Sequence, residues 1–321
     1  MYDSSSQKIF VADSGGFLYG YNTSGTKVMD SSRLAINTGG IVQGPLLDSS
    51  TGYVYAFVGQ DANTDSNSVC GAGTYSSGCS GVFRFPTSNS STGNTGVTCE
   101  ATDAGTGWYT GTNCGSEMEM GEGTSASSIV YDGAFDHIYY SGSGNTGNMW
   151  SCSTTVACAG CSKLVYLPMS TSFPTVLGFG YSTVYPVNNA PGGTCSPTSE
   201  VYGTAGSTDD YVFISPSANG SFNSTDCYVG GTGSDGGCIY SFLVGSGGST
   251  IHPTTATAGI NAGLGSSGII IDNTSGTTGA SQIYFSPLGW DAGGSGIPAT
   301  CPEVNSTIVG CAVQASQLAL E

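Results

Sequence analysis

The segment Lys8-Ile-Phe-Val-Ala-Asp-Ser-Gly-Gly-Phe-Leu-Tyr-Gly-Tyr-Asn-Thr-Ser-Gly25 contains a short apolar run, a glycine turn and a second run with an aromatic at every other position. This pattern predicts a β-hairpin, because the side chains of a strand alternate between its two faces. The first run holds a β-branched residue followed by an aromatic, Ile9-Phe10. Similar pairs recur at Val54-Tyr55, Ile138-Tyr139, Val212-Phe213 and Ile283-Tyr284.

An aspartate precedes three of these pairs by the same interval, at Asp3, Asp48 and Asp132. The fifth pair follows Asp272 across a longer turn rich in Gly, Ser and Thr. Because the same strand-forming pattern recurs along the chain, the sequence predicts an array of similar small sheets.

The repeats divide the 321 residues into five units of one domain, residues 1–38, 39–122, 123–193, 194–260 and 261–321. Each unit offers three or four short antiparallel strands separated by turn clusters. In the third unit, we expect strands at 127–132, 137–141 and 148–150. The sequence therefore predicts an all-β fold, a β-propeller-like array of about five four-stranded blades with long loops.

The first and last blades look incomplete in the sequence. Only Met1 and Tyr2 precede Asp3, so the first unit is expected to begin at its second strand, and the last unit ends after its third. Either the chain is part of a longer propeller, or the strands close in an unusual order, or a neighbouring molecule supplies a strand. An unpaired strand edge is a template for pairing between chains. We expect such an edge near Asp3 and Ile9 and near Cys311.

Charge is sparse and one-sided, with five Lys and Arg against 22 Asp and Glu and a net charge of -17. Nucleic-acid binding needs clustered cations that neutralise phosphates, so this composition argues against it. It argues equally against anionic membrane surfaces, and no apolar run reaches transmembrane length. The acidity favours solubility outside the cell, with cation binding as the alternative.

The twelve cysteines predict disulfides in an oxidising compartment, so the protein is expected to be secreted or at the cell surface. Most fall in close pairs that bracket short polar loops, and zinc is disfavoured because the chain has only two histidines. The expected pairs are Cys70/Cys79, Cys99/Cys114, Cys227/Cys238 and Cys301/Cys311. The pairing among Cys152, Cys158, Cys161 and Cys195 stays open.

Catalytic signals are weak. Neither His137 nor His252 lies near a nucleophile motif, which argues against a serine hydrolase. Glycosidases need two carboxylates, and the candidates are Glu117, Glu119, Glu122, Asp132, Asp136, Asp209, Asp210 and Asp291. Nothing in the sequence brings them together.

Two kinds of ligand site are considered. Asp61 and Asp65 lie in a run of oxygen-bearing side chains, although this run lacks the EF-hand pattern. Because Ca2+ prefers oxygen ligands, it is the one cofactor we consider. Trp108 and Trp290 lie in Gly-rich loops and could stack on sugars, whereas Trp150 is expected in the core.

The segment 8–25 resembles the blade phrase of bacterial secreted propellers of the PQQ-like, NHL and YVTN type. The resemblance implies a propeller fold and leaves function open, because such propellers serve as scaffolds, binders and enzymes. The PQQ enzymes' cofactor pocket is not implied, since the chain has no vicinal cysteine pair and no Asp-Glu-Asn cluster that matches theirs.

The sequence thus favours a non-enzymatic extracellular structural or adhesive protein that assembles with copies of itself, through exchange of a strand at an open blade edge. The alternative is a secreted carbohydrate-binding or carbohydrate-active propeller that uses loop acids and tryptophans on glycans.

Overall fold

The computed structural model describes residues 1–31, 33–35, 40–61, 79–88, 116–122, 129–142, 146–155, 161–169, 195–203, 207–217, 237–262, 265–272, 282–288 and 312–316. The chain divides into two compact units. Unit 1 comprises residues 1–132, 153–156 and 170–179, and unit 2 comprises residues 133–152, 157–169 and 180–321. Among the described residues, no helix is long and apolar enough to cross a membrane.

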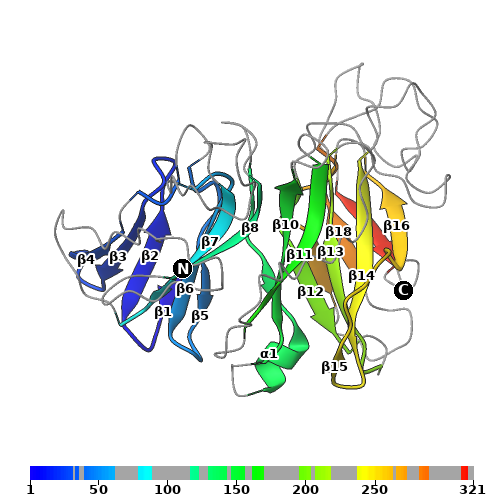
Figure 1. Cartoon of the computed structure of the whole chain (residues 1–321), viewed down its shortest axis with the longest axis horizontal. Helices are drawn as coiled ribbons and strands as arrows, with labels where there is room; N and C mark the ends of the chain where they lie inside the picture. The colour runs from blue at the N-terminus through cyan, green and yellow to red at the C-terminus, as the bar shows by residue number, and fades with distance from the viewer. Residues whose placement is uncertain are drawn as a thin grey trace. The chain divides into compact units, whose positions relative to one another are not determined.

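Unit 1 contains two antiparallel sheets whose strands follow one another in sequence order (Figure 1). The first sheet consists of β1 (Tyr2–Asp3), β2 (Lys8–Ala12), β3 (Leu18–Asn22) and β4 (Lys27–Asp30). The second consists of β5 (Leu46–Asp48), β6 (Tyr53–Val58), β7 (Cys79–Pro86) and β8 (Ser116–Glu122).

The core of unit 1 lies between these two sheets. Alternate residues of the first sheet, such as Phe10 and Leu18, are fully buried and form one cluster with Val54, Ala56 and Phe85 of the second. Gly20 allows this packing, because a Cβ there would lie 3.3 Å from the Phe10 ring. The hairpin predicted for residues 8–21 is therefore confirmed, with its apolar period facing the core.

Unit 2 contains three antiparallel sheets (Figure 1). The third sheet has the order β11 (Cys161–Pro168), β10 (Asn148–Thr155), β9 (Ala134–Phe135). The fourth has β12 (Ser199–Tyr202), β13 (Asp210–Ile214) and β14 (Cys238–Ser246), with both β15 (Ser249–Thr250) and β16 (Ala258–Asn261) paired to β14. The fifth has β17 (Ile270–Asp272), β18 (Gln282–Phe285) and β19 (Val313–Ser316).

The fourth sheet is apolar on both faces. One face, with Val212 and Tyr240, packs on Trp150 and Leu164 of the third sheet. The other, with Phe213 and Ile239, packs on Ile283 and other residues of the fifth. Its central strands read as continuous apolar runs because both faces are covered. The described residues are thus mostly β and form several small antiparallel sheets, which confirms the predicted all-β class.

The prediction of a strand at residues 137–141 was wrong. His137–Ser141 form a short helix, α1, and the repeated pair Ile138-Tyr139 lies within it. Asp136 caps this helix by accepting a hydrogen bond from the Tyr139 amide, which favours a helical turn over an extended chain. The strand that follows the turn is β10, where Met149 pairs with Phe135 of β9.

The expectation that the first unit begins at its second strand was also wrong. Tyr2 and Asp3 form β1, which pairs antiparallel with Ile9 and Lys8 of β2. Met1 extends this ladder, because its carbonyl accepts the Phe10 amide at 2.8 Å. Ile9 therefore lies in an inner strand, and β1 occupies the strand position beside it.

Candidate functional site

The outer face of the first sheet is apolar and exposed. It consists of Tyr2, Ile9, Val11, Tyr19 and Tyr21, which alternate along their strands with the buried residues of the core. The exposed fractions of Tyr2, Ile9 and Val11 are 51%, 41% and 45%. The pairing register places Tyr2, Ile9 and Tyr21 side by side on three adjacent strands, with Val11 opposite Tyr19. These side chains therefore form one continuous patch.

Lys27 lies at the border of this face. Its ammonium group is 5.5 Å from the centre of the Tyr19 ring and 2.8 Å from Asp30 Oδ2. Residues 1–34 hold three of the five Lys and Arg but only three of the 22 Asp and Glu. The first sheet is therefore electrically neutral, and the rest of the chain carries the whole net charge of -17.

The fifth sheet also has an exposed outer face. Ile270 of β17 is 69% exposed and lies opposite Tyr284 of β18. Gln314 of β19 is the next residue across, and its side chain donates a hydrogen bond of 3.1 Å to the Tyr284 hydroxyl. Asp272 adds a carboxylate on the same face, two residues beyond Ile270.

A cluster of carboxyl groups forms a second candidate site, entirely within unit 2. Asp136 follows β9, Glu200 is in β12, and Asp210 begins β13. Tyr202 lies opposite Asp210 in the register, so Glu200, two residues earlier, is diagonal to Asp210 on the same face. Gly245 lies opposite Asp210 on the other side, where an added Cβ would be 3.1 Å from the Asp210 Cβ.

Asp136 is fully engaged as a structural acceptor. It is buried, and its carboxylate accepts hydrogen bonds from the Tyr139 amide at 2.9 Å, from the Asn148 amide at 2.9 Å and from the Asn148 side chain at 3.0 Å. The Trp150 indole lies within 3.4 Å of the same carboxylate. These donors account for the position of Asp136 without a ligand.

Glu200 and Asp210 form a coupled pair. The pKa of Glu200 is raised to about 9, chiefly by burial and also by its hydrogen bond to Asp210 and by the charges of Asp210 and Asp136. Burial also raises the pKa of Asp210, although the hydrogen bonds from Glu200 and from the His137 amide oppose the increase. Glu200 is therefore the protonated member at neutral pH and donates to Asp210.

This arrangement limits the chemistry of the pair. Retaining glycosidases hold their two carboxyl groups roughly 5 Å apart, and inverting enzymes hold them farther apart. Glu200 and Asp210 are close enough to share a hydrogen bond, which is closer than either of these spacings. The pair can share a proton, and it does not have the spacing of a glycosidase site.

The two histidines contact aromatic rings in unit 2. The His137 ring stacks on Tyr202 with 3.3 Å between ring centres, and the His252 ring stacks on Tyr166 at 3.9 Å. Burial lowers the pKa of His252. Each histidine ring is therefore packed against a tyrosine ring.

The sequence predicted other site residues that the structure places apart from these sites. Asp61 is buried at 1% exposure and forms a backbone bridge with Ala35. Within the described ranges, no group of three or more His, Cys, Asp or Glu is placed to hold a metal ion. Trp150 is fully buried, as expected. Of the metal-binding, ligand-binding and catalytic residues predicted from the sequence, those outside the described ranges are Asp65, Trp108, Trp290 and Asp291.

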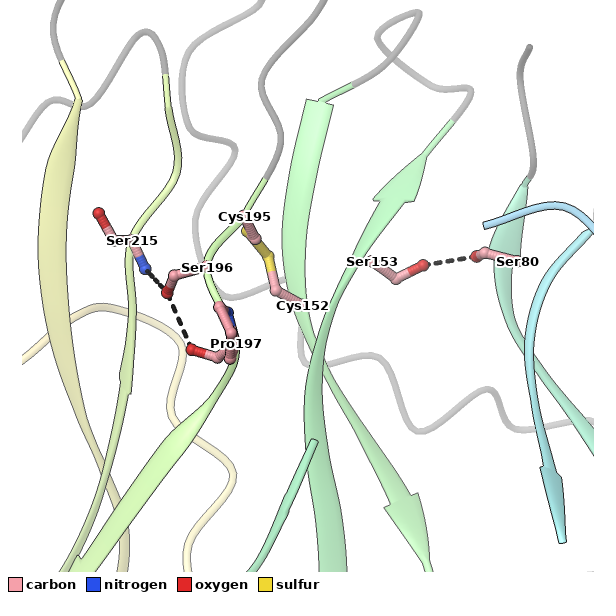
Figure 2. The surroundings of a disulfide bond; sticks show 7 residues. All are labelled: Ser80, Cys152, Ser153, Cys195, Ser196, Pro197 and Ser215. Atoms are coloured by element: carbon pink, nitrogen blue, oxygen red, sulfur yellow. Dashed lines mark hydrogen bonds between the residues drawn. A yellow bond between two sulfur atoms is a disulfide. The ribbon is translucent and has the colours of Figure 1, made fainter. Parts of the chain in front are cut away.

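One of the open cysteine pairings is resolved. Cys152 of β10 is bonded to Cys195, with 5.9 Å between the Cα atoms (Figure 2). Cys238 is disulfide-bonded as well. Cys79 and Cys161 lie in strands, but their side chains are not described. The cysteines outside the described residues are Cys70, Cys99, Cys114, Cys158, Cys227, Cys301 and Cys311.

Sequence reasoning named Asp136 and Asp210 as candidate carboxylates but missed Glu200. The glycosidase candidates Glu117, Glu119 and Glu122 lie in β8, where their side chains are not described. The available signal for Glu200 was a charged residue within a short strand, next to the apolar Val201.

Comparisons of this chain with protein families, with curated proteins and with solved structures found no match.

Proposed function

We propose that this protein is a non-enzymatic extracellular structural protein that assembles with copies of itself. The outer face of the first sheet would dock on the outer face of the fifth sheet of the next copy. The observation that carries the proposal is the exposure of both faces, with Tyr2, Ile9, Val11 and Ile270 each more than 40% exposed.

Apolar exposure of this kind favours association. Soluble monomers rarely expose large contiguous apolar patches, and such patches usually mark an interaction site. The outer face of the first sheet has aromatic and β-branched side chains adjacent on three strands. Tyrosine is enriched at protein interfaces because it combines apolar area with a polar end.

The charge distribution favours a second copy as the occupant of each face. Two molecules of net charge -17 repel one another, so contact is least costly through a neutral surface. The outer face of the first sheet is that surface, and Lys27 lies at its border. The outer face of the fifth sheet carries Asp272, which is of opposite sign to Lys27. A head-to-tail contact of different faces produces open filaments rather than closed dimers.

We place the contact on the sheet faces rather than on a strand edge, because β1 fills the strand position beside β2 that was expected to be missing. The five sheets would then be blades of a propeller-like array. Support for this comes from the fourth sheet, which is covered on both faces. The Cys152–Cys195 disulfide supports a location outside the cell.

Complementary variants test the contact. Ile9→Thr/Val11→Thr disables only the first-sheet face, and Ile270→Thr disables only the fifth-sheet face, while threonine keeps the strand propensity. By light scattering, wild type should form large species, each variant alone should be monomeric, and an equimolar mixture of the two should form dimers. Tyr140→Ser, at a residue 60% exposed on α1, is the matched control and should polymerise like wild type.

Other outcomes would overturn the proposal. A monomeric wild type at high concentration would show that these faces are covered within one molecule or stay free. A mixture that remains monomeric would show that the two faces do not bind each other.

A further inference from the structure

The segment that follows β9 contacts the fourth sheet through a few specific interactions. The backbone amide of His137 donates a hydrogen bond of 2.7 Å to Asp210 Oδ2. The His137 ring lies flat on the Tyr202 ring, with an angle of 6° between the ring planes. Helix α1 is therefore attached to the fourth sheet through Asp210 and Tyr202, which lie opposite each other in β13 and β12.

This attachment brings like charges together. Asp136, next to His137 in the chain, is buried, and Asp210 is 2% exposed. Asp136 acts on both Glu200 and Asp210 with a repulsive charge. Three ionised carboxylates at this junction would repel one another strongly, because the surroundings screen charge poorly.

A proton relieves the repulsion. Asp210 uses Oδ2 for the His137 amide, and its Oδ1 is buried without a fixed hydrogen-bond donor. Protonated Glu200 can donate to Asp210, which satisfies the carboxylate and removes one negative charge. In the described part of the chain no group of metal ligands is placed to do this instead.

We propose that a proton shared by Glu200 and Asp210 holds helix α1 on the fourth sheet, and that loss of this proton in alkaline solution releases the helix. The groups that face the pair come from each neighbouring element. They are Asp136 and His137 from the β9–α1 segment, Tyr202 from β12 and Gly245 from β14. Asp209 is next to Asp210 in the chain, and its carboxylate accepts the Ser246 hydroxyl.

The direction of the pH dependence follows from linkage. Burial, together with the hydrogen bond to Asp210 and the nearby negative charges, raises the pKa of Glu200 from 4.5 to about 9, so the folded state binds this proton more tightly than the unfolded state does. The attachment is strongest below the unfolded pKa, weakens as the pH rises between these two values, and changes no further above the folded pKa. Asp136 and Asp210 remain as the repelling charges.

Amide hydrogen exchange of the His137 amide in the full chain, followed by NMR, tests this proposal. After correction for the intrinsic exchange rate, protection in wild type should fall at least tenfold between about pH 6 and about pH 10, since one pKa unit corresponds to a factor of ten. In Glu200→Gln, protection should change less than twofold, because a neutral amide donates to Asp210 at every pH. The amide of Ile239 in β14 reports whether the fourth sheet stays folded.

Asp30→Asn is the matched control, since it removes a carboxylate that pairs with Lys27 in unit 1. It should keep the tenfold decrease of wild type. Constant protection of His137 in wild type, or an equal decrease in Glu200→Gln, would overturn the proposal. Polymerisation is measured separately by light scattering, so failure of this proposal and failure of the proposed function can be told apart.

Discussion

At the scale of single residues, an aspartate at the end of the first strand organises the turn that follows. Asp3 ends β1 and accepts hydrogen bonds from the Ser5 amide, the Ser5 hydroxyl and the Ser6 amide at 3.3, 2.8 and 3.1 Å. Asp48 ends β5 and does the same for Ser50 and Thr51. The repeated aspartate is therefore a turn residue, because a carboxylate satisfies amides that the strand ladder leaves free.

Asp3→Ala should destabilise unit 1 by about 2 kcal/mol, because it removes several partly buried hydrogen bonds worth roughly 1 kcal/mol each. Chemical denaturation of the full chain measures this loss. Ser4→Ala, at an exposed position of the same turn, is the control and should cost less than about 0.5 kcal/mol. Equal stability of the two variants would contradict the assignment of Asp3 as the residue that stabilises this turn.

The ionisation of Asp3 makes the stability of unit 1 depend on pH. Burial alone would raise its pKa, but hydrogen bonds from neighbouring serine hydroxyls and from the Ser5 amide outweigh this and hold the pKa well below its ordinary value. Stability from Asp3 is therefore complete above the ordinary pKa of about 4 and is lost as the pH falls below it. Asp3→Asn should remove this part of the acid dependence of unfolding.

The repeated aspartates could be predicted from the sequence at Asp3 and Asp48 but not in the third unit. The interval pointed to Asp132, whereas the structure uses Asp136. Asp132 has a carboxylate oxygen without a partner, and burial raises its pKa to about 6. The interval failed because a helix is inserted in the turn. Glu200 was missed because its proton partner is in another strand, which no local pattern reveals.

At the scale of elements, α1 is that insertion. Its cap Asp136 also accepts the Asn148 amide, so one carboxylate closes the turn from β9 to β10. Gly147 has φ of 86°, and a Cβ there would collide with Asp136 and with the Tyr139 amide. The apolar pair Ile138-Tyr139 was predicted as a strand because a short apolar run cannot distinguish a strand from a buried helical turn.

Asp136→Ala should destabilise unit 2 by about 2–3 kcal/mol, since it leaves two backbone amides and the Asn148 side chain without their acceptor. Asp136→Asn should cost less, because the amide oxygen still accepts one or two of these bonds. Urea denaturation followed by tryptophan fluorescence measures both variants. An alanine variant as stable as the asparagine variant would show that the cap contributes little.

At the scale of the whole molecule, the all-β class could be predicted from the sequence, because turn clusters delimit short apolar runs along the chain. Pairing of Cys152 with Cys195 could not, since it depends on β10 of the third sheet meeting the start of the fourth. The exposed sheet faces could not be predicted either, because an apolar strand position looks the same whether a neighbouring sheet covers it or not.

The Cys152–Cys195 disulfide closes a long loop with a sequence separation of 43 residues. Cys152→Ser/Cys195→Ser should therefore lower the stability of unit 2 by about 3–4 kcal/mol, chiefly by raising the entropy of the unfolded chain. Calorimetry of the oxidised proteins measures the change. An unchanged unfolding temperature would show that the bond constrains the unfolded chain very little.

Electron microscopy of the undissociated wild-type protein tests whether copies of it assemble through exposed sheet faces. When wild type and Ile9→Thr/Val11→Thr are imaged at the same concentration, we expect regular filaments for wild type and single particles for the variant. Single particles in both samples would contradict it, and so would filaments that persist unchanged in the variant.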